Sequence, residues 1–155
     1  MLPGRVRLAL RAHYAICGVF DVAYNGQGEP VGIRAISERQ AIPARYLEQI
    51  FQRLRKAGLV ASRRGPGGGY VLARPAAAIT LREVVEAVEG PLAGAVSPGP
   101  PASAAQTPYR PDFLWPELAT GVAGLLAQVS LESLCRDASR ARVERAEPPA
   151  PMYFI

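Results

Sequence analysis

Residues 45–74 read RYLEQIFQRLRKAGLVASRRGPGGGYVLAR, and this stretch decides the fold. Its first part predicts an amphipathic helix, because apolar residues recur at spacings of three and four. We expect the apolar stripe to face inward; it comprises Tyr46, Leu47, Ile50, Phe51, Leu54 and Ala57. The opposite face is then polar and basic, with Arg45, Glu48, Gln49, Gln52, Arg53, Arg55 and Lys56.

The second part of the stretch predicts a β-hairpin. Gly58 suits the left-handed residue that ends a helix, and beyond it the apolar pattern changes to a period of two over residues 59–64 and 70–74. Arg63 and Arg64 stand at the base of the hairpin. Its turn tolerates positive φ because it is rich in glycine, with Gly65, Pro66, Gly67, Gly68 and Gly69. A helix followed by a basic hairpin indicates a winged helix, whose helix enters the major groove of DNA while the wing reaches the backbone or minor groove.

The residues before this stretch complete a helix-turn-helix. A short helix is predicted over residues 33–40, and residues 41–43 form a tight connection into the helix that begins near Ala44. A long first helix is predicted over residues 6–25, where nearly every turn carries apolar groups, and residues 27–30 form a turn by composition. The predicted fold class is therefore mainly α with a small β-hairpin wing (α+β).

Basic charge is concentrated in the N-terminal half. Residues 1–75 hold 12 Arg or Lys against 4 Asp or Glu, a net +8, whereas residues 76–155 hold 6 against 9, a net −3. Such a field attracts nucleic acid, and no basic amphipathic helix with exposed Trp or Phe favours a membrane instead. We expect phosphate contacts from Arg5, Arg7, Arg34, Arg53, Arg55 and Lys56; for the first two, a solvated helix end is an equal alternative.

Cysteine usage and the N-terminus favour a cytoplasmic protein. Cys17 and Cys135 are the two cysteines, and neither lies in a CxxC spacing that would suggest a redox motif. The apolar run at residues 14–24 is broken by Asp21 and lacks a cleavage site, and no segment approaches the roughly 20 apolar residues of a membrane span. One histidine and two separated cysteines are poor material for catalysis, so we do not expect an enzyme.

The run ISERQAIPARYLEQIFQRLRKAGLVASRRGPGGGYVLAR at residues 36–74 resembles the Rrf-two family of winged-helix transcription regulators, the family of IscR, NsrR and CymR. The likeness extends to Tyr14 in the first helix, to ITLREVVEAVEG at residues 79–90 and to LWPEL at residues 114–118. It implies a homodimer that binds a palindromic operator in double-stranded DNA and usually represses transcription.

The resemblance also implies roles in DNA reading. In DNA-bound family members, the residues matching Arg45, Glu48 and Gln49 face base edges, and the arginine matching Arg64 enters the minor groove from the wing, where Arg63 lies beside it. The chemistry agrees, because glutamine can pair with adenine, a carboxylate can accept from cytosine, and arginine suits a narrow minor groove. Many family members have a small residue in place of Arg45, so the operator preference can differ here.

The chain beyond the wing divides into further predicted parts. Thr80 and Glu83 form a capping box that begins a helix ending near Gly90. The predicted divisions are a winged-helix DNA-binding domain at 1–90, a flexible Gly/Pro/Ala/Ser loop at 91–112, a dimerisation helix with a short following helix at 113–138, and a frayed C-terminal tail at 139–155.

The loop at 91–112 occupies the position where cluster-binding relatives carry three cysteines. The matching residues here are Ser97, Ser103 and Tyr109, and serine rarely replaces thiolate, so we expect neither a cofactor nor an iron–sulfur cluster in this loop. His13 and Cys17 are the remaining candidate metal ligands, because residues four apart share one face of a helix. We favour the alternative that they have structural roles.

An apolar seam follows the loop and predicts a partner helix. In the family, the long helix here pairs across the dimer axis; the alternative is packing on its own domain alone. The expected dimer interface comprises Trp115, Leu118, Val122, Leu125 and Val129, and Ser130 is expected to cap a further short helix.

These patterns favour a cytoplasmic, homodimeric winged-helix repressor. The alternative is a cluster-free sensor or interaction module that acts mainly through a protein partner, or a variant metal or iron–sulfur sensor that uses His13 and Cys17. A protein partner or a small-molecule effector is expected to supply the signal.

Overall fold

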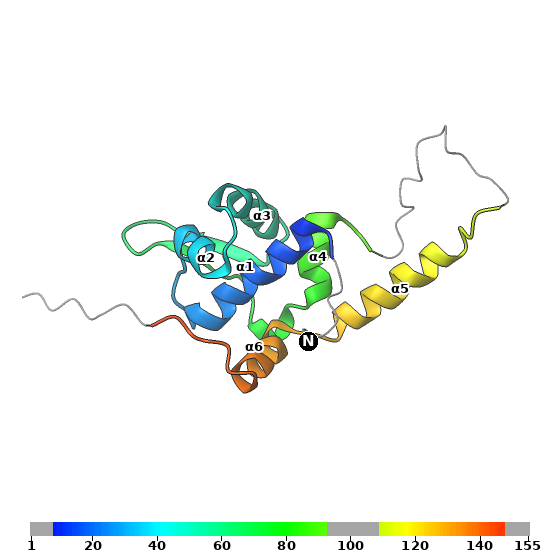
Figure 1. The fold of residues 1–155 in the computed structure, drawn as a ribbon. Helices are drawn as coiled ribbons and strands as arrows, with labels where there is room; N and C mark the ends of the chain where they lie inside the picture. The colour runs from blue at the N-terminus through cyan, green and yellow to red at the C-terminus, as the bar shows by residue number, and fades with distance from the viewer. Residues whose placement is uncertain (1–7, 93–108, 148–155) are drawn as a thin grey trace, which may run out of the picture.

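The computed structural model describes residues 8–92 and 109–147. Their fold is the expected one, helical with a two-stranded antiparallel wing (Figure 1). The elements follow in the order α1 (Leu10–Gly26), α2 (Ile33–Gln40), α3 (Ala44–Lys56), β1 (Val60–Arg63), β2 (Gly69–Leu72), the 3-10 helix η1 (Ala76–Ala78), α4 (Leu81–Glu89), α5 (Leu114–Ala127) and α6 (Leu131–Arg140).

Helix α1 is the centre of the fold, and α2, α3, α4 and α6 all pack against it (Figure 1). Gly18 permits the close approach of α3, because a Cβ at this position would lie 2.9 Å from a ring atom of Phe51. The helix begins at Leu10, because Ala9 has a non-helical backbone with φ −52° and ψ 143°; residue 6, where the sequence predicted the start, lies outside the described residues. Arg5 and Arg7 lie outside the described residues.

The predicted inward stripe of α3 is confirmed for its central residues and wrong at both ends. Its four buried members are Leu47, Ile50, Phe51 and Leu54. Tyr46 remains 53% exposed, with its ring 6.3 Å from that of Tyr14 on α1. Ala57 is exposed because it follows the last helical residue, and Gly58 then turns the chain with a φ of 76°.

The wing is a short antiparallel hairpin in which Val60 pairs with Leu72 and Arg63 with Gly69. Both strands are shorter than predicted. Val31, in the connection after α1, adds a bridge that the sequence did not predict: its N–H and C=O both bond to Tyr70, at 2.9 Å. Gly69 allows this approach, because a Cβ there would lie 2.4 Å from the Val31 backbone.

Helix α4 begins with the predicted capping box. The Glu83 N–H donates to Thr80 Oγ1 at 3.3 Å, and the Thr80 N–H donates to Glu83 Oε2 at 3.1 Å. A second capping box, between Ser130 and Ser133, begins α6. Both caps satisfy backbone donors that a helix start leaves unpaired.

The C-terminal part departs from the expected elements in two places. Val129 lies beyond the end of α5, because Gln128 ends the helix and the Val129 carbonyl accepts the Leu81 N–H at 2.9 Å. The tail is not frayed from residue 139: α6 continues to Arg140, and residues 143–146 bond to the end of α1. Residues 148–155, and 93–108 of the predicted loop, lie outside the described residues.

Candidate nucleic-acid interface

The turn between α2 and α3 fixes the start of the candidate recognition helix. Ala41 turns the chain with a left-handed backbone, φ 55° and ψ 45°. Ser37 Oγ donates to the Ile42 carbonyl at 2.6 Å, and the Ile42 N–H donates to the Ser37 carbonyl at 3.1 Å. With Ile42 and Leu47 buried on either side of Pro43, the orientation of α3 is set by both hydrogen bonds and packing.

The predicted base-reading residues share the outer face of α3. Arg45, Glu48 and Gln49 are exposed, and within the described part of the chain no ion pair or side-chain hydrogen bond engages them. Their donors and acceptors are therefore available, while the opposite face of the helix is buried in the core.

The wing carries two exposed arginines, Arg63 at the end of β1 and Arg64 after it. Two contacts hold the wing against the helix-turn-helix and the segment before it. The Val31 bridge joins it to the segment after α1, and the Tyr70 ring lies 4.7 Å from the ring of Phe51 on α3, centroid to centroid. The predicted turn tip is exposed from Gly65 to Gly67, where Gly65 has a φ of 103°.

The predicted phosphate-binding residues fall into two groups. Arg55 and Lys56 are exposed and have no ion-pair partner among the described residues. Arg34 faces solvent but pairs with Glu38 on the same helix at 3.3 Å. Arg53 Nη1 donates to the Val88 carbonyl at 2.9 Å, so this arginine ties α3 to the last turn of α4. Such a bond suits the negative end of a helix.

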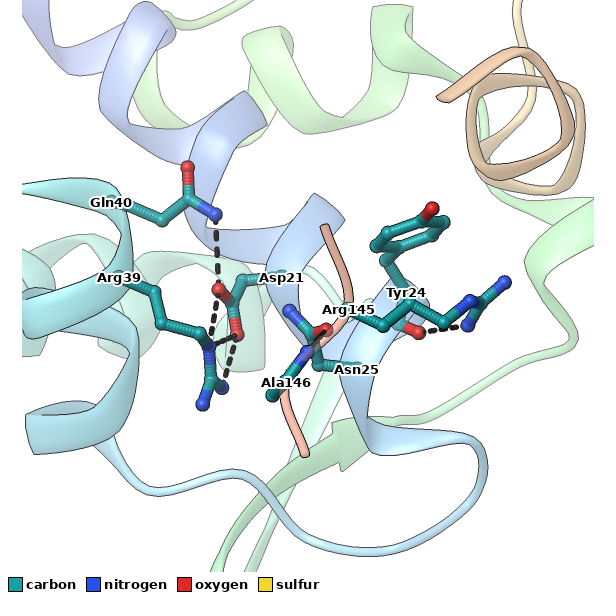
Figure 2. A network of polar contacts seen from close by, with 7 residues as sticks. All are labelled: Asp21, Tyr24, Asn25, Arg39, Gln40, Arg145 and Ala146. Atoms are coloured by element: carbon teal, nitrogen blue, oxygen red, sulfur yellow. Dashed lines mark hydrogen bonds and ion pairs between the residues drawn. The ribbon is translucent and has the colours of Figure 1, made fainter. Parts of the chain in front are cut away.

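An ion pair between α1 and α2, in which the carboxylate is buried and the guanidinium is partly exposed, was not predicted. Asp21 of α1 is fully buried and accepts from Arg39 and from Gln40, the last two residues of α2. Figure 2 shows both side chains converging on its carboxylate. The hydrogen bond to Asp21 raises the pKa of the Arg39 guanidinium. The signal that could have found this pair is Asp21 itself, an acid within an otherwise apolar run, because buried acids require a partner.

The predicted dimer residues lie mostly on an exposed helix. Helix α5 projects from the body (Figure 1), and among its residues Ala123 alone is buried. The side chains of Trp115 and Leu125 are 57% and 67% exposed, and those of Leu118 and Val122 are also exposed. A row of large apolar side chains on one helix face is typical of a surface that a partner covers.

His13 and Cys17 do lie side by side, with Cys17 Sγ 3.8 Å from His13 Nε2. Burial raises the pKa of the Cys17 thiol, which disfavours the thiolate that binds metal. Within residues 8–92 and 109–147, no three His, Cys, Asp or Glu side chains are grouped so that they could hold a metal ion.

The exposed polar recognition helix and the arginine-bearing wing together define a winged-helix DNA-binding protein. Comparison with known proteins agrees with this class. The Rrf2 family, described as iron-dependent transcriptional regulators, matches residues 8–137.

The chain is similar to the HTH-type transcriptional regulator IscR of Photorhabdus laumondii, with 41% identity over 129 residues, 83% of this chain and 79% of that protein. IscR of Escherichia coli O1:K1 / APEC is 40% identical over 129 residues, which cover 83% of this chain and 80% of that protein. Among solved structures, T. potens IscR has a TM-score of 0.72 at 28% identity, covering 91% of this chain and 94% of that one. CymR of B. subtilis has a TM-score of 0.66 at 28% identity, covering 86% and 98%.

The chain belongs to the Rrf2 family and is a winged-helix transcriptional regulator. Of the described residues, none form a helix long and apolar enough to cross a membrane.

The iron in the family's description raises the question of a cluster. An iron–sulfur cluster needs about three or four thiolate ligands, and this chain has two cysteines, Cys17 and Cys135. Burial raises the pKa of the Cys135 thiol, and a nearby Arg145 lowers it in part. The donor set of one chain therefore does not fit a conventional cluster.

Proposed function

We propose that this regulator acts in the cytoplasm as a homodimer that binds a palindromic DNA operator and represses transcription. Each protomer supplies one α3 and one wing. Two recognition helices enter successive major grooves, about one helical turn apart, while the wings grip the flanking minor grooves. The bound dimer then blocks access of the polymerase to the promoter.

The observation that carries this proposal is that the chain carries two exposed surfaces, one on the winged helix and one on α5. The polar row of α3 and the wing arginines have the chemistry of base and backbone recognition. The apolar row of α5 lies on a helix that projects from the body (Figure 1) and has the composition of a self-associating seam. A two-fold arrangement of such protomers matches the symmetry of an inverted repeat.

Within this arrangement, we propose the following roles. Gln49 pairs with adenine, Glu48 accepts from a cytosine amino group, and Arg45 donates to a base edge. Arg64 enters the minor groove, with Arg63 beside it. Arg55 and Lys56 neutralise phosphates. The hydrogen bonds of Arg34 to Glu38 and of Arg53 to the Val88 carbonyl leave part of each guanidinium for the same role.

Selection of duplexes from a random library, using the full chain, tests this proposal. An enriched inverted repeat with A·T-rich flanks is the expected result. The affinity for this repeat, measured by fluorescence anisotropy, should fall by about 10³-fold or more between 50 and 200 mM salt if six or more phosphates are contacted. Selection that enriches no motif would contradict sequence-specific binding.

A second candidate function is a metal sensor built on His13 and Cys17. The 3.8 Å separation of Sγ and Nε2 favours it, because both donors already face the same space. The raised pKa of Cys17 opposes it, and further ligands would have to come from outside the described residues or from a second protomer.

Purification of the untagged protein without oxygen, followed by iron, sulfide and zinc analysis and an absorption spectrum, tests this second function. Stoichiometric metal that is lost in both His13→Ala and Cys17→Ser would establish the site. Metal-free protein that still binds the selected repeat would leave the signal to a protein partner or a small-molecule effector.

A further inference from the structure

The C-terminal segment at residues 143–146 is bonded to the last turn of α1. The Tyr24 hydroxyl donates to the Val143 carbonyl at 2.7 Å, and the Ala146 N–H donates to Asn25 Oδ1 at 2.7 Å. Arg145 contributes twice: Nη1 donates to the Tyr24 carbonyl, and the guanidinium carbon lies 4.0 Å from the centre of the Tyr24 ring. We call residues 143–146 the clasp.

The clasp supplies what the end of α1 lacks. The last turn of α1 contains no basic residue, although the carbonyls at a helix C-terminus attract positive charge. Arg145 provides that charge and a hydrogen bond from 121 residues further along the chain. Because Tyr24 is buried, its ring offers Arg145 a fixed, partly desolvated face.

Asp21, which binds the end of α2, lies about one helical turn before the residues of α1 that bind the clasp. Asp21 holds Arg39 and Gln40, which immediately precede the Ala41 turn into α3. Figure 2 shows the two groups of contacts beside each other on α1. They share a cavity of about 450 Å³, lined by Asp21, Arg39 and Gln40 on one side and by Val143, Arg145 and Ala146 on the other.

The wing depends on the same end of α1. The chain leaves α1 at Gly26 and reaches Val31 after a short turn, and Val31 pairs with Tyr70 of β2. The C-terminal end of α1 therefore contacts the end of α2, just before the α2–α3 turn, and leads directly into the segment that pairs with the wing. A contact that holds this end of α1 affects both DNA-reading elements together.

We propose that Arg145 is a positioning residue for operator binding. The clasp fixes the last turns of α1, and α1 in turn fixes the α2–α3 turn through Asp21 and the wing through Val31. Arg145 does not need to touch DNA for this role. The proposal rests on the proposed operator binding, and it predicts an effect on specific binding that exceeds the effect of losing one positive charge.

Substitution of Arg145 in the full chain tests the proposal, with Arg136→Ala as the matched control. Arg136 is exposed on α6 and has no ion-pair partner among the described residues, so both alanine variants remove one arginine charge from the same region. The readouts are affinity for the selected repeat, affinity for a random duplex at the same salt, and amide hydrogen exchange over residues 37–46.

Arg145→Ala should weaken binding to the repeat by about tenfold, as expected if the binding-competent arrangement of α3 and the wing falls to about one tenth of the population, while random-duplex binding changes by no more than about twofold. Amide exchange at residues 37–46 should accelerate. Arg145→Lys should recover part of the repeat affinity, because an ammonium group can still donate at the helix end. Arg136→Ala should change both affinities by no more than about twofold.

Equal effects of Arg145→Ala and Arg136→Ala would overturn the proposal and leave only a charge effect. If Arg145→Ala fails to fold, Arg145→Gln provides the test, because it removes the charge and the guanidinium but keeps an amide donor near the helix end. It should weaken repeat binding selectively; unchanged repeat binding would overturn the proposal. Wild-type protein that selects no repeat would refute the proposed function itself, a distinguishable failure.

Discussion

Asp21 and Arg39 form a bidentate ion pair between α1 and α2. Arg39 Nη2 lies 2.6 Å from Asp21 Oδ1 and Nε lies 3.0 Å from Oδ2, and the Asp21 side chain is fully buried. Gln40 adds a further hydrogen bond to Asp21 at 2.9 Å (Figure 2). The pair thus fixes the helix-turn-helix to the central helix at the residues just before its turn.

Arg39→Ala should destabilise the protein by about 3 to 5 kcal/mol, because it leaves the buried Asp21 carboxylate without its cation. Denaturant unfolding measures the change. Arg34→Ala is the control on the same helix: its pair with Glu38 is exposed, so a loss below about 1 kcal/mol is expected. Similar losses in both variants would show that the buried pair has no special role.

Glu83 should make the stability of the protein depend on acid pH. Burial alone would raise the pKa of its carboxyl, but hydrogen bonds from Arg74 and from the Thr80 N–H together lower it. The stabilisation is therefore present above the unfolded-state pKa of about 4.3, and it is lost as the pH falls through the lower folded-state pKa.

Glu83→Gln isolates this effect, since glutamine retains the capping-box geometry but has no charge for Arg74. The unfolding free energy of the variant should be lower at neutral pH by less than about 1 kcal/mol, because the pair is partly exposed. The difference from wild type should disappear as the pH falls through the folded-state pKa. A constant difference across this range would contradict the assignment.

Leu118→Glu should convert the proposed dimer to a monomer, because it places a charge in the centre of the apolar row of α5. Sedimentation velocity measures the change. Thr120→Glu adds the same charge to the same helix about 160° away, on a face outside the apolar row, and should leave the dimer intact. Dissociation by both variants would indicate general damage to α5, and an unchanged Leu118→Glu dimer would exclude this row as the interface.

The two classes of DNA contact should respond differently to substitution. Gln49→Ala should relax discrimination within the half-site by about 1 to 3 kcal/mol, because it removes a base-edge contact. Arg64→Ala should weaken binding most when the flanks are A·T-rich, because those narrow minor grooves attract arginine. A panel of single-base variants of the selected repeat measures both effects. Equal losses on every sequence would refute the assigned roles.

Local signals predicted most of the winged helix from the sequence. The apolar period of residues 46–54, the glycine-rich turn and the Thr80 capping box act between neighbours in the chain, so their patterns are visible without a structure. The ends of elements were less predictable. Both Tyr46 and Val129 continue an apolar spacing, but Tyr46 is exposed on α3 and Val129 lies beyond the end of α5. Spacing alone does not show where a helix ends or which positions meet a neighbour.

The contacts that position the winged helix could not be predicted because they join distant residues. Asp21 and Arg39 are 18 residues apart, and Tyr24 and Arg145 are 121 apart. The C-terminal sequence around Arg145 is charged and rich in proline, a composition typical of disorder. The contacts of Arg145 depend on the carbonyl and the ring of Tyr24 at the end of α1, and neither leaves a pattern in the C-terminal sequence.

The most direct test of the central claim is the effect of half-site spacing on binding to the selected inverted repeat. The full chain is titrated against the repeat, against the repeat with about five base pairs inserted between its half-sites, and against a single half-site. Half a helical turn places the second half-site on the opposite face of the duplex. A dimer that reads both half-sites should bind the intact repeat at two protomers per duplex and lose at least about tenfold in affinity on each altered duplex. Equal affinity for all three duplexes would contradict a dimer whose two heads bind DNA together.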